Sequence, residues 1–107
     1  MTNRIKAKKA LGQHFLHDEA IAKRIAYSLP AQMGDNILEV GPGKGILSKY
    51  LLEMSSNLKC VEFDHDIINY LEEFEPQLFE RAIESDFLKL PLEKVFGSEF
   101  YLIGNYP

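Results

Sequence analysis

The first block of regular hydrophobic spacing lies near the N-terminus, after an irregular stretch over residues 1–16. In the segment HDEAIAKRIAYSLP, residues 17–30, an apolar residue recurs at every fourth position, which predicts an amphipathic helix. Asp18 or His17 begins this helix, and Pro30 ends it. The expected apolar stripe consists of Ile21, Ile25 and Leu29.

Short apolar runs then alternate with segments of helical period. The expected strands are DNILEVG (35–41), LKCVEFD (58–64), a short run within ERAIESDF (80–87), and Phe100 to Ile103. The expected helices between the first three strands are GILSKYLLEM (45–54) and DHDIINYLEEF (64–74). Strands that alternate with helices imply parallel pairing through right-handed crossovers. The predicted fold class is α/β, part of a doubly wound sheet of about four parallel strands with helices on both faces.

A glycine-rich loop, GPGKG, joins the first predicted strand to the following helix. Gly41 and Gly43 lack a Cβ atom, so the backbone can turn tightly and approach a ligand closely. The helix N-terminus beyond the loop adds free N–H groups. The spacing GxGxG differs from the GxGxxG of dinucleotide enzymes and from the P-loop pattern. A tight turn without a ligand is the alternative interpretation.

Acidic residues follow the second and third predicted strands. Glu62 lies 21 residues after Gly41 and could accept hydrogen bonds from both hydroxyls of a ribose. Phe63 could pack against an adenine or belong to the core, and Asp86 could accept from an adenine exocyclic amine. A solvated acid is the alternative for Glu62, but the loop and the acid together favour nucleoside binding.

Asn105, in IGNYP, follows the fourth predicted strand at the carboxyl edge of the sheet. Ligands of open α/β sheets bind at this edge. The Asn105 amide oxygen and the next backbone carbonyl could hold an exocyclic amine. The competing interpretation is a turn signal after a strand.

Composition and charge fit one soluble domain with a local basic segment. The chain has 107 residues, of which 46% are hydrophobic, and a net charge of -4. No apolar run could span a bilayer, and no signal peptide is recognised, so we expect a cytoplasmic protein. The single Cys60 is expected to be a buried apolar residue, with a reactive thiol as the alternative. The four cations near the N-terminus suggest contact with a polyanion or a solvated terminus; they are Arg4, Lys6, Lys8 and Lys9.

Five motifs in register resemble the ribosomal RNA adenine N6-dimethyltransferases. They are KKALGQHFLHD, LEVGPGKG, VEFD, SDFLKL and IGNYP; they are spread from residue 8 to residue 107, so the resemblance extends over nearly the whole chain. The likeness is greatest to bacterial enzymes of 16S, small-subunit rRNA, and the erythromycin-resistance methyltransferases of 23S rRNA are similar. The resemblance implies an S-adenosylmethionine-dependent transferase that dimethylates rRNA adenines during ribosome maturation. A non-catalytic factor that binds RNA or the cofactor is the alternative, and GxGxG disfavours an NAD-binding domain.

The resemblance also implies roles for individual residues. Leu11, Gln13 and His14 would belong to a motif that covers the cofactor. Gly41, Gly43 and Gly45 would form the turn beside its methionine part, supported by Glu39. Glu62 would bind the ribose, Phe63 would lie against the adenine, and Asp86 with Phe87 would mark the adenine edge. Asn105, with Tyr106 and Pro107, would hold N6 of the target adenine and border the cofactor.

The chain departs from the family pattern in two ways. His14 stands where the family usually has Asn, and no further ligands support a metal site with His17. The family's fourth-strand motif continues with an aromatic residue, which would be residue 108. We therefore expect an inactive N-terminal fragment: an arm over 1–16 and part of a catalytic domain over 17–107, lacking the remaining sheet and a helical C-terminal domain. Its exposed sheet edge would allow self-association, whereas the full-length protein is expected to be a monomer that binds rRNA.

Overall fold

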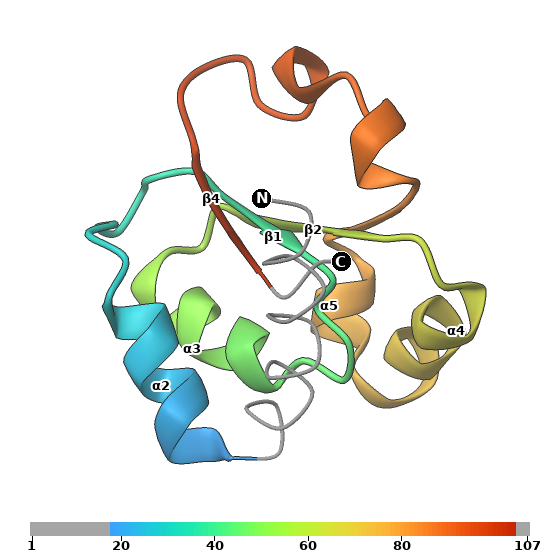
Figure 1. Cartoon of the computed structure of the whole chain (residues 1–107), viewed down its shortest axis with the longest axis horizontal. Coiled ribbons are helices and arrows are strands. Elements are labelled where there is room, and N and C mark those ends of the chain that lie inside the picture. Colours follow the sequence, from blue (N-terminus) through green and yellow to red (C-terminus); the bar gives the residue numbers. More distant parts are fainter. Residues whose placement is uncertain (1–17, 105–107) are drawn as a thin grey trace, which may run out of the picture.

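The computed structural model describes residues 18–104, and these form four parallel strands with helices between them (Figure 1). The helices are α2 (Glu19–Tyr27), α3 (Ile46–Met54), α4 (His65–Phe74) and α5 (Pro76–Phe79), with 3-10 turns η1 (Phe87–Lys89) and η2 (Leu92–Lys94). The strands are β1 (Ile37–Val40), β2 (Leu58–Glu62), β3 (Ala82–Glu84) and β4 (Tyr101–Gly104). None of the helices within 18–104 is long and apolar enough to cross a membrane.

The strand order in the sheet is β3-β2-β1-β4, and every pairing is parallel. The first three strands are added in one direction, and β4 then returns to the other side of β1. This reversal between β1 and β4 is the topological switch point of a doubly wound sheet. The predicted α/β fold class is therefore confirmed.

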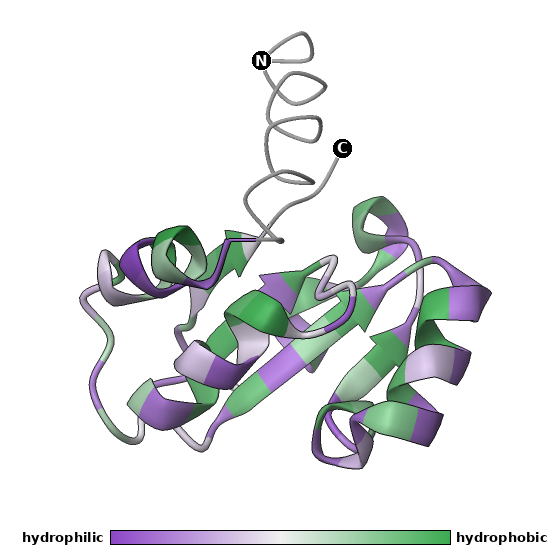
Figure 2. Ribbon diagram, turned by 90° about the horizontal axis from the view of Figure 1, so that it is seen from below, coloured by the Kyte–Doolittle hydropathy of each residue, from purple (hydrophilic) through white to green (hydrophobic). Residues whose placement is uncertain are grey.

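The two faces of the sheet are covered differently. Leu47 and Leu51 of α3 and Leu71 of α4 pack with Ile37 and Leu58 of the sheet in one buried cluster. The segment after β3 covers the opposite face (orange in Figure 1), with a second buried cluster formed by Leu38, Val40, Val61, Val95 and Phe96. We expected helices on both faces, but in the described part of the chain the second face is covered by 3-10 turns and a loop. Figure 2 shows that the strands are predominantly hydrophobic and that hydrophobic and hydrophilic residues alternate along the helices.

Helix α2 begins where one of the two sequence alternatives placed it. The Asp18 carboxylate accepts a hydrogen bond from the Ile21 N–H at 3.2 Å, so Asp18, and not His17, is the N-cap. The residues buried most deeply are Ala22 and Ala26, whereas Ile21 and Ile25 of the predicted stripe are half-buried. The small side chains of Ala22 and Ala26 allow α2 to lie close to α3, and the larger Ile25 packs partly buried against the same cluster.

Two boundaries differ from the sequence prediction. The sequence predicted a helix that ends at residue 74 and none directly after it, but Pro76 opens the short helix α5, where proline needs no N–H partner. The fourth strand begins one residue later than expected, since the Phe100 ring pairs with Phe96 at 5.5 Å between centroids and belongs to the core. The fourth strand also ends one residue later than expected, at Gly104.

Gly104 lies where two backbones approach most closely. A Cβ atom at this position would be 2.1 Å from the carbonyl oxygen of Val40, and φ is 156°. No side chain can be accommodated without moving one of the two strands. Glycine at this position therefore fixes the distance between β4 and the end of β1.

Cys60 lies in β2 with no exposed surface. Burial is the main cause that raises the pKa of its thiol, and the neighbouring Glu39 raises it further. Because the thiolate is the reactive form, the reactive-thiol interpretation is wrong. Cys60 is instead a small buried side chain, as the apolar interpretation predicted.

Candidate functional site

The parallel register brings the predicted site residues to one edge of the sheet. Val40, the last residue of β1, pairs with Val61 of β2 and with Gly104 of β4, and Glu62 pairs with Glu84 of β3. The chain therefore leaves the ends of β1, β2 and β3 side by side. The glycine loop, Glu62 and Asp86 follow these three strands in the same order.

The glycine loop has a conformation that requires glycine. The φ angles of Gly41, Gly43 and Gly45 are 72°, 56° and 90°, all in the left-handed region. The Gly41 N–H donates to the Val61 carbonyl at 2.9 Å, and the Gly45 N–H donates to the Pro42 carbonyl at 2.9 Å. Gly45 caps α3 without a side-chain hydrogen bond to the first turn. The loop thus leads directly into a helix N-terminus, as the sequence predicted.

A buried carboxyl group lies beside the loop. Glu39 is 1% exposed, and its Oε1 accepts hydrogen bonds from the Ser48 hydroxyl and, at 3.7 Å, from the Cys60 thiol. Burial raises the pKa of Glu39 from an ordinary 4.5 to about 7; the two hydrogen bonds oppose the shift, and the nearby Glu62 adds to it. Glu39 therefore links β1 to α3 and β2.

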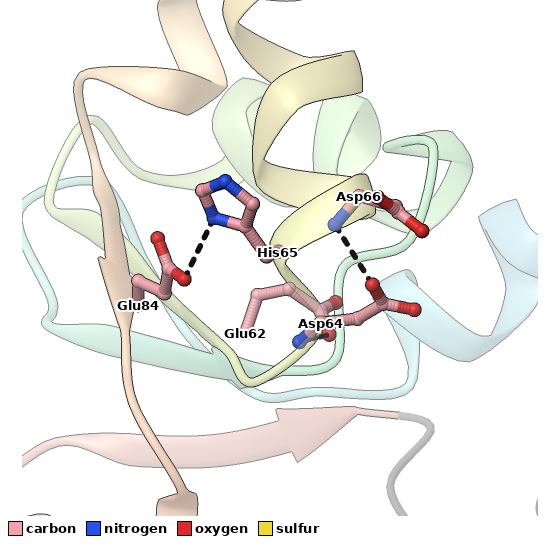
Figure 3. A network of polar contacts seen from close by, with 5 residues as sticks. All are labelled: Glu62, Asp64, His65, Asp66 and Glu84. Carbon is pink, nitrogen blue, oxygen red and sulfur yellow. Dashed lines mark hydrogen bonds and ion pairs between the residues drawn. The ribbon is translucent and has the colours of Figure 1, made fainter.

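Glu62 belongs to a second group of polar residues at the same edge (Figure 3). Its Oε2 accepts from the Asp64 N–H at 3.0 Å, and Asp64 caps α4 by accepting from the Asp66 N–H at 2.8 Å. The His65 Nδ1 lies 3.0 Å from Oε2 of Glu84, which joins the start of α4 to the end of β3. Since a carboxylate has about four acceptor positions, Glu62 retains capacity for further donors.

The aromatic residues at this edge lie in two different environments. Phe63 is 74% exposed, so the core interpretation is wrong for this side chain. Phe87 instead packs against the cluster on the sheet beneath it. Asp86 is half-buried and caps η1 by accepting from the Leu88 N–H at 3.0 Å. The exposed Phe63 ring therefore offers a flat apolar surface beside Glu62.

Several predicted site residues lie outside the described residues. They are the basic residues Arg4, Lys6, Lys8 and Lys9, the N-terminal motif residues Leu11, Gln13 and His14, and the C-terminal Asn105, Tyr106 and Pro107. Among residues 18–104, no group of three or more His, Cys, Asp or Glu side chains could hold a metal ion. The structure therefore brings together the glycine loop, Glu39, Glu62, Phe63, Asp86 and Phe87.

Comparison with known proteins assigns the chain to a family. A family model described as ribosomal RNA adenine dimethylase matches residues 4–107. The chain belongs to the ribosomal RNA adenine dimethylase family. Membership accounts for the order of the loop, the acid and the later motifs along almost the entire sequence.

Relatives of this dimethylase family carry one name in three organisms, Ribosomal RNA small subunit methyltransferase A. The protein from Porphyromonas gingivalis is 48% identical over 97% of this chain, and the chain covers 41% of that relative. The Parabacteroides distasonis protein is 50% identical over 96% of the chain, with 39% of the relative covered. The Flavobacterium johnsoniae protein is 46% identical over 97% of the chain, with 40% of the relative covered. The chain thus spans about 40% of the length of these relatives.

A solved structure supports the fold of this chain independently of sequence. DesVI from Streptomyces venezuelae superposes with a TM-score of 0.57 over 97% of the chain and 42% of its own length. The two share 16% sequence identity, so the likeness concerns the arrangement of the elements alone.

Sequence reasoning missed Ser48 as part of the candidate site. Its signal was a polar residue between the apolar Leu47 and Leu51 in a predicted helix that follows a strand containing a glutamate. Buried polar groups are normally paired. The sequence thus offered a reason to look for a partner of Ser48, whereas the identity of that partner depends on how α3 lies on β1.

Proposed function

We propose that this protein is an S-adenosylmethionine-dependent dimethyltransferase of adenine N6 in small-subunit, 16S ribosomal RNA. The observation that carries this proposal is the placement of the glycine loop, Glu62 and Asp86 at adjacent strand ends, in a chain of the dimethylase family. The names of the relatives favour the small subunit over 23S rRNA.

The described residues fit a nucleoside carrying an amino acid. Glu62 would accept from the two ribose hydroxyls, Phe63 would lie against the adenine, and Asp86 would accept from its amine. Its exposed surface makes Phe63 available for this contact. Gly41, Gly43 and Gly45 would pass close to the methionine part, with Glu39 fixing the loop from below. In the segment before α2, Leu11, Gln13 and His14 would cover the cofactor.

Bound S-adenosylmethionine would supply an activated methyl group on a sulfonium. The chain's own contribution would be to hold the accepting nitrogen in line with that group. The Asn105 side-chain oxygen and the Tyr106 carbonyl would accept hydrogen bonds from N6, and Pro107 would fix the backbone between them and the next segment. Asn105 follows β4 directly, across the switch point from the glycine loop. The proton released from N6 would pass to solvent, and two transfers would give dimethyladenine.

The target adenine must leave its stack or come from an RNA loop to reach such a site. The cations Arg4, Lys6, Lys8 and Lys9 would contact RNA phosphates nearby. Because the chain covers about 40% of its relatives, we expect the 107 residues to bind the cofactor without methylating RNA.

Calorimetry on the 107-residue chain tests the cofactor assignment. We expect binding of S-adenosylhomocysteine and none of NAD, and we expect Glu62→Ala to weaken the binding at least 10-fold, since a buried ribose would lose two charge-assisted hydrogen bonds. Glu80→Ala is the control, because Glu80 is an exposed acid at the opposite end of β3. NAD binding with no response to S-adenosylhomocysteine would overturn the assignment.

Methylation of immature small subunits tests the reaction. A full-length protein that contains these residues is expected to dimethylate adenine, and Asn105→Ala in that protein should abolish transfer while leaving cofactor affinity within about 2-fold. Full activity of the Asn105→Ala variant would contradict the role of Asn105. Cofactor binding without any transfer by the unaltered full-length protein would instead support a non-catalytic assembly factor.

A further inference from the structure

A side-chain hydrogen bond closes the glycine loop from beneath. Glu39 lies two residues before Gly41, and Ser48 lies three residues after Gly45. The Ser48 hydroxyl donates to Glu39 Oε1, so this bond joins the strand that enters the loop to the helix that leaves it. Ser48 is fully buried, and Glu39 is 1% exposed. The loop is therefore held at both ends by one polar contact that water does not reach.

We propose that Ser48 is a positioning residue for the glycine loop, acting through Glu39, and that the strength of this buried contact governs how firmly the loop holds the cofactor. The inference rests on the proposed function, because it takes the loop to be a cofactor site. Ser48 itself points to the carboxyl group and is not proposed to touch the cofactor.

The geometry determines which group donates. Ser48 and Cys60 both donate to the same oxygen of Glu39, so Oε1 acts as an acceptor in either protonation state. A carboxylate accepts hydrogen bonds more strongly than a neutral carboxyl group does. Ionisation of Glu39 therefore strengthens its link to α3 and orders the loop.

The groups around Glu39 place this ionisation close to neutral pH. Burial raises the pKa of Glu39 to about 7, the Ser48 and Cys60 hydrogen bonds lower it, and the charge of Glu62 raises it. Arg81 acts on the Cys60 thiol, whose pKa is nevertheless raised by burial, so Cys60 remains a donor. A pH change from 6 to 8 thus converts Glu39 from mainly neutral to mainly charged, and cofactor affinity is expected to rise with it.

The first test measures the titration of Glu39 itself in the 107-residue chain. Carbon-13 NMR of labelled glutamate carboxyl groups follows this titration, and the signal lost in Glu39→Gln identifies it. Ser48→Ala is expected to shift the midpoint to higher pH, because the opposing hydrogen bond is removed. Ser48→Thr retains the hydroxyl and is expected to restore the midpoint. Ser55→Ala is the matched control, since Ser55 is equally buried and donates to the Asp35 carbonyl at 2.6 Å, away from Glu39.

The second test measures S-adenosylhomocysteine affinity by calorimetry between pH 6 and pH 9. Ser48→Ala is expected to bind roughly 5-fold more weakly at pH 7, the effect of losing one hydrogen bond of typical strength. The deficit should grow towards high pH, because the ionised Glu39 of the unaltered chain accepts from Ser48 more strongly, and the variant lacks this bond. Loss of packing alone would lower the affinity by the same factor at every pH.

An unchanged Glu39 midpoint in Ser48→Ala overturns the inference, as does an affinity loss that is independent of pH or equal in Ser55→Ala. If the unaltered chain binds no S-adenosylhomocysteine at any pH, the proposed function fails and the coupling to the cofactor fails with it. An altered midpoint with a pH-dependent affinity loss supports both.

Discussion

The two sides of the candidate site are built by different means. The loop side, Glu39 to Ser48, depends on buried contacts: a carboxyl group under the loop, a helix that starts at a left-handed glycine, and Leu78 against that glycine. The acid side, Glu62 to Asp66 with Glu84, depends on exposed polar groups that cap a helix and bridge to β3. The shape of the first follows from the packing of the whole domain, whereas the second is organised locally.

This difference predicts that substitutions on the loop side affect folding, whereas substitutions on the acid side affect ligand binding with little effect on stability. Buried packing and strained backbone account for most large destabilisations, and exposed ion pairs contribute little.

The largest effect is expected from Gly104→Ala, at the strand that supports the loop side. The added Cβ would be 2.1 Å from the Val40 carbonyl oxygen, and backbone atoms cannot move aside as a flexible side chain can. We expect a loss of at least about 4 kcal/mol in the free energy of unfolding, measured by urea denaturation. Gly97→Ala is the control, because a Cβ there meets nothing within 4 Å. Equal stability of the two variants would mean that the strands can separate freely.

The next largest effect concerns Glu39→Gln and depends on pH. The pKa of Glu39 is about 7 in the folded chain against an ordinary 4.5, so the folded state binds the proton more tightly. Wild-type stability should therefore fall as the pH rises from about 4.5 to about 7, by up to about 3 kcal/mol, and then level off. Glu39→Gln lacks this titration.

Urea denaturation at pH 5 and pH 8 isolates the contribution of Glu39, because the other carboxyl groups titrate in both proteins. Glu39→Gln should gain stability relative to the wild type as the pH rises. A difference between the two proteins that stays constant with pH would show that Glu39 ionises normally, and the buried character of the loop side would be wrong.

A smaller effect is expected from Gly45→Ala. Its φ of 90° disfavours a residue with a side chain, and the new Cβ would lie 2.5 Å from Leu78 Cδ1. Because this is the end of a flexible side chain, it can turn away, and we expect a loss of about 1–2 kcal/mol, mainly from backbone strain. Adding Leu78→Ala to Gly45→Ala tests the contact. A Gly45 effect that disappears in the Leu78→Ala background would mean that the clash, and not φ, determines the cost.

The smallest effect is expected from His65→Ala, on the acid side. The side chains of His65 and Glu84 are 69% and 46% exposed, so solvent screens their interaction. We expect a change of no more than about 0.5 kcal/mol by urea denaturation, close to that of Asn69→Ala on the exposed side of α4. A loss above about 1.5 kcal/mol would remove the distinction between the two sides.

The sequence predicted the acid side better than the loop side. Asp64 as a helix start and Glu62 at a strand end follow from local patterns, and the structure has both. The GxGxG spacing also predicted a turn into a helix, and that turn is present. The contact between Ser48 and Glu39 depends on how α3 lies on β1, which no local pattern encodes.

The sequence predicted the order of the strands and helices well, but it predicted less well what covers each face of the sheet. Alternation of strands and helices gave the parallel sheet, but the covering of its second face depends on residues 87–100, whose apolar spacing has no regular period. The exposed position of Phe63 was equally unpredictable, because an aromatic residue after a strand is compatible with the core and with a ligand surface.

The close approach of Gly104 to Val40 has a consequence for how the protein can vary. The ends of β1 and β4 meet through main chain alone at this point. Substitutions elsewhere can change the surroundings of the glycine loop, but they leave the main-chain contact between the ends of β1 and β4 as it is. The separation of the two strand ends is therefore that of two hydrogen-bonded strands, about 4.8 Å, and is independent of side-chain size.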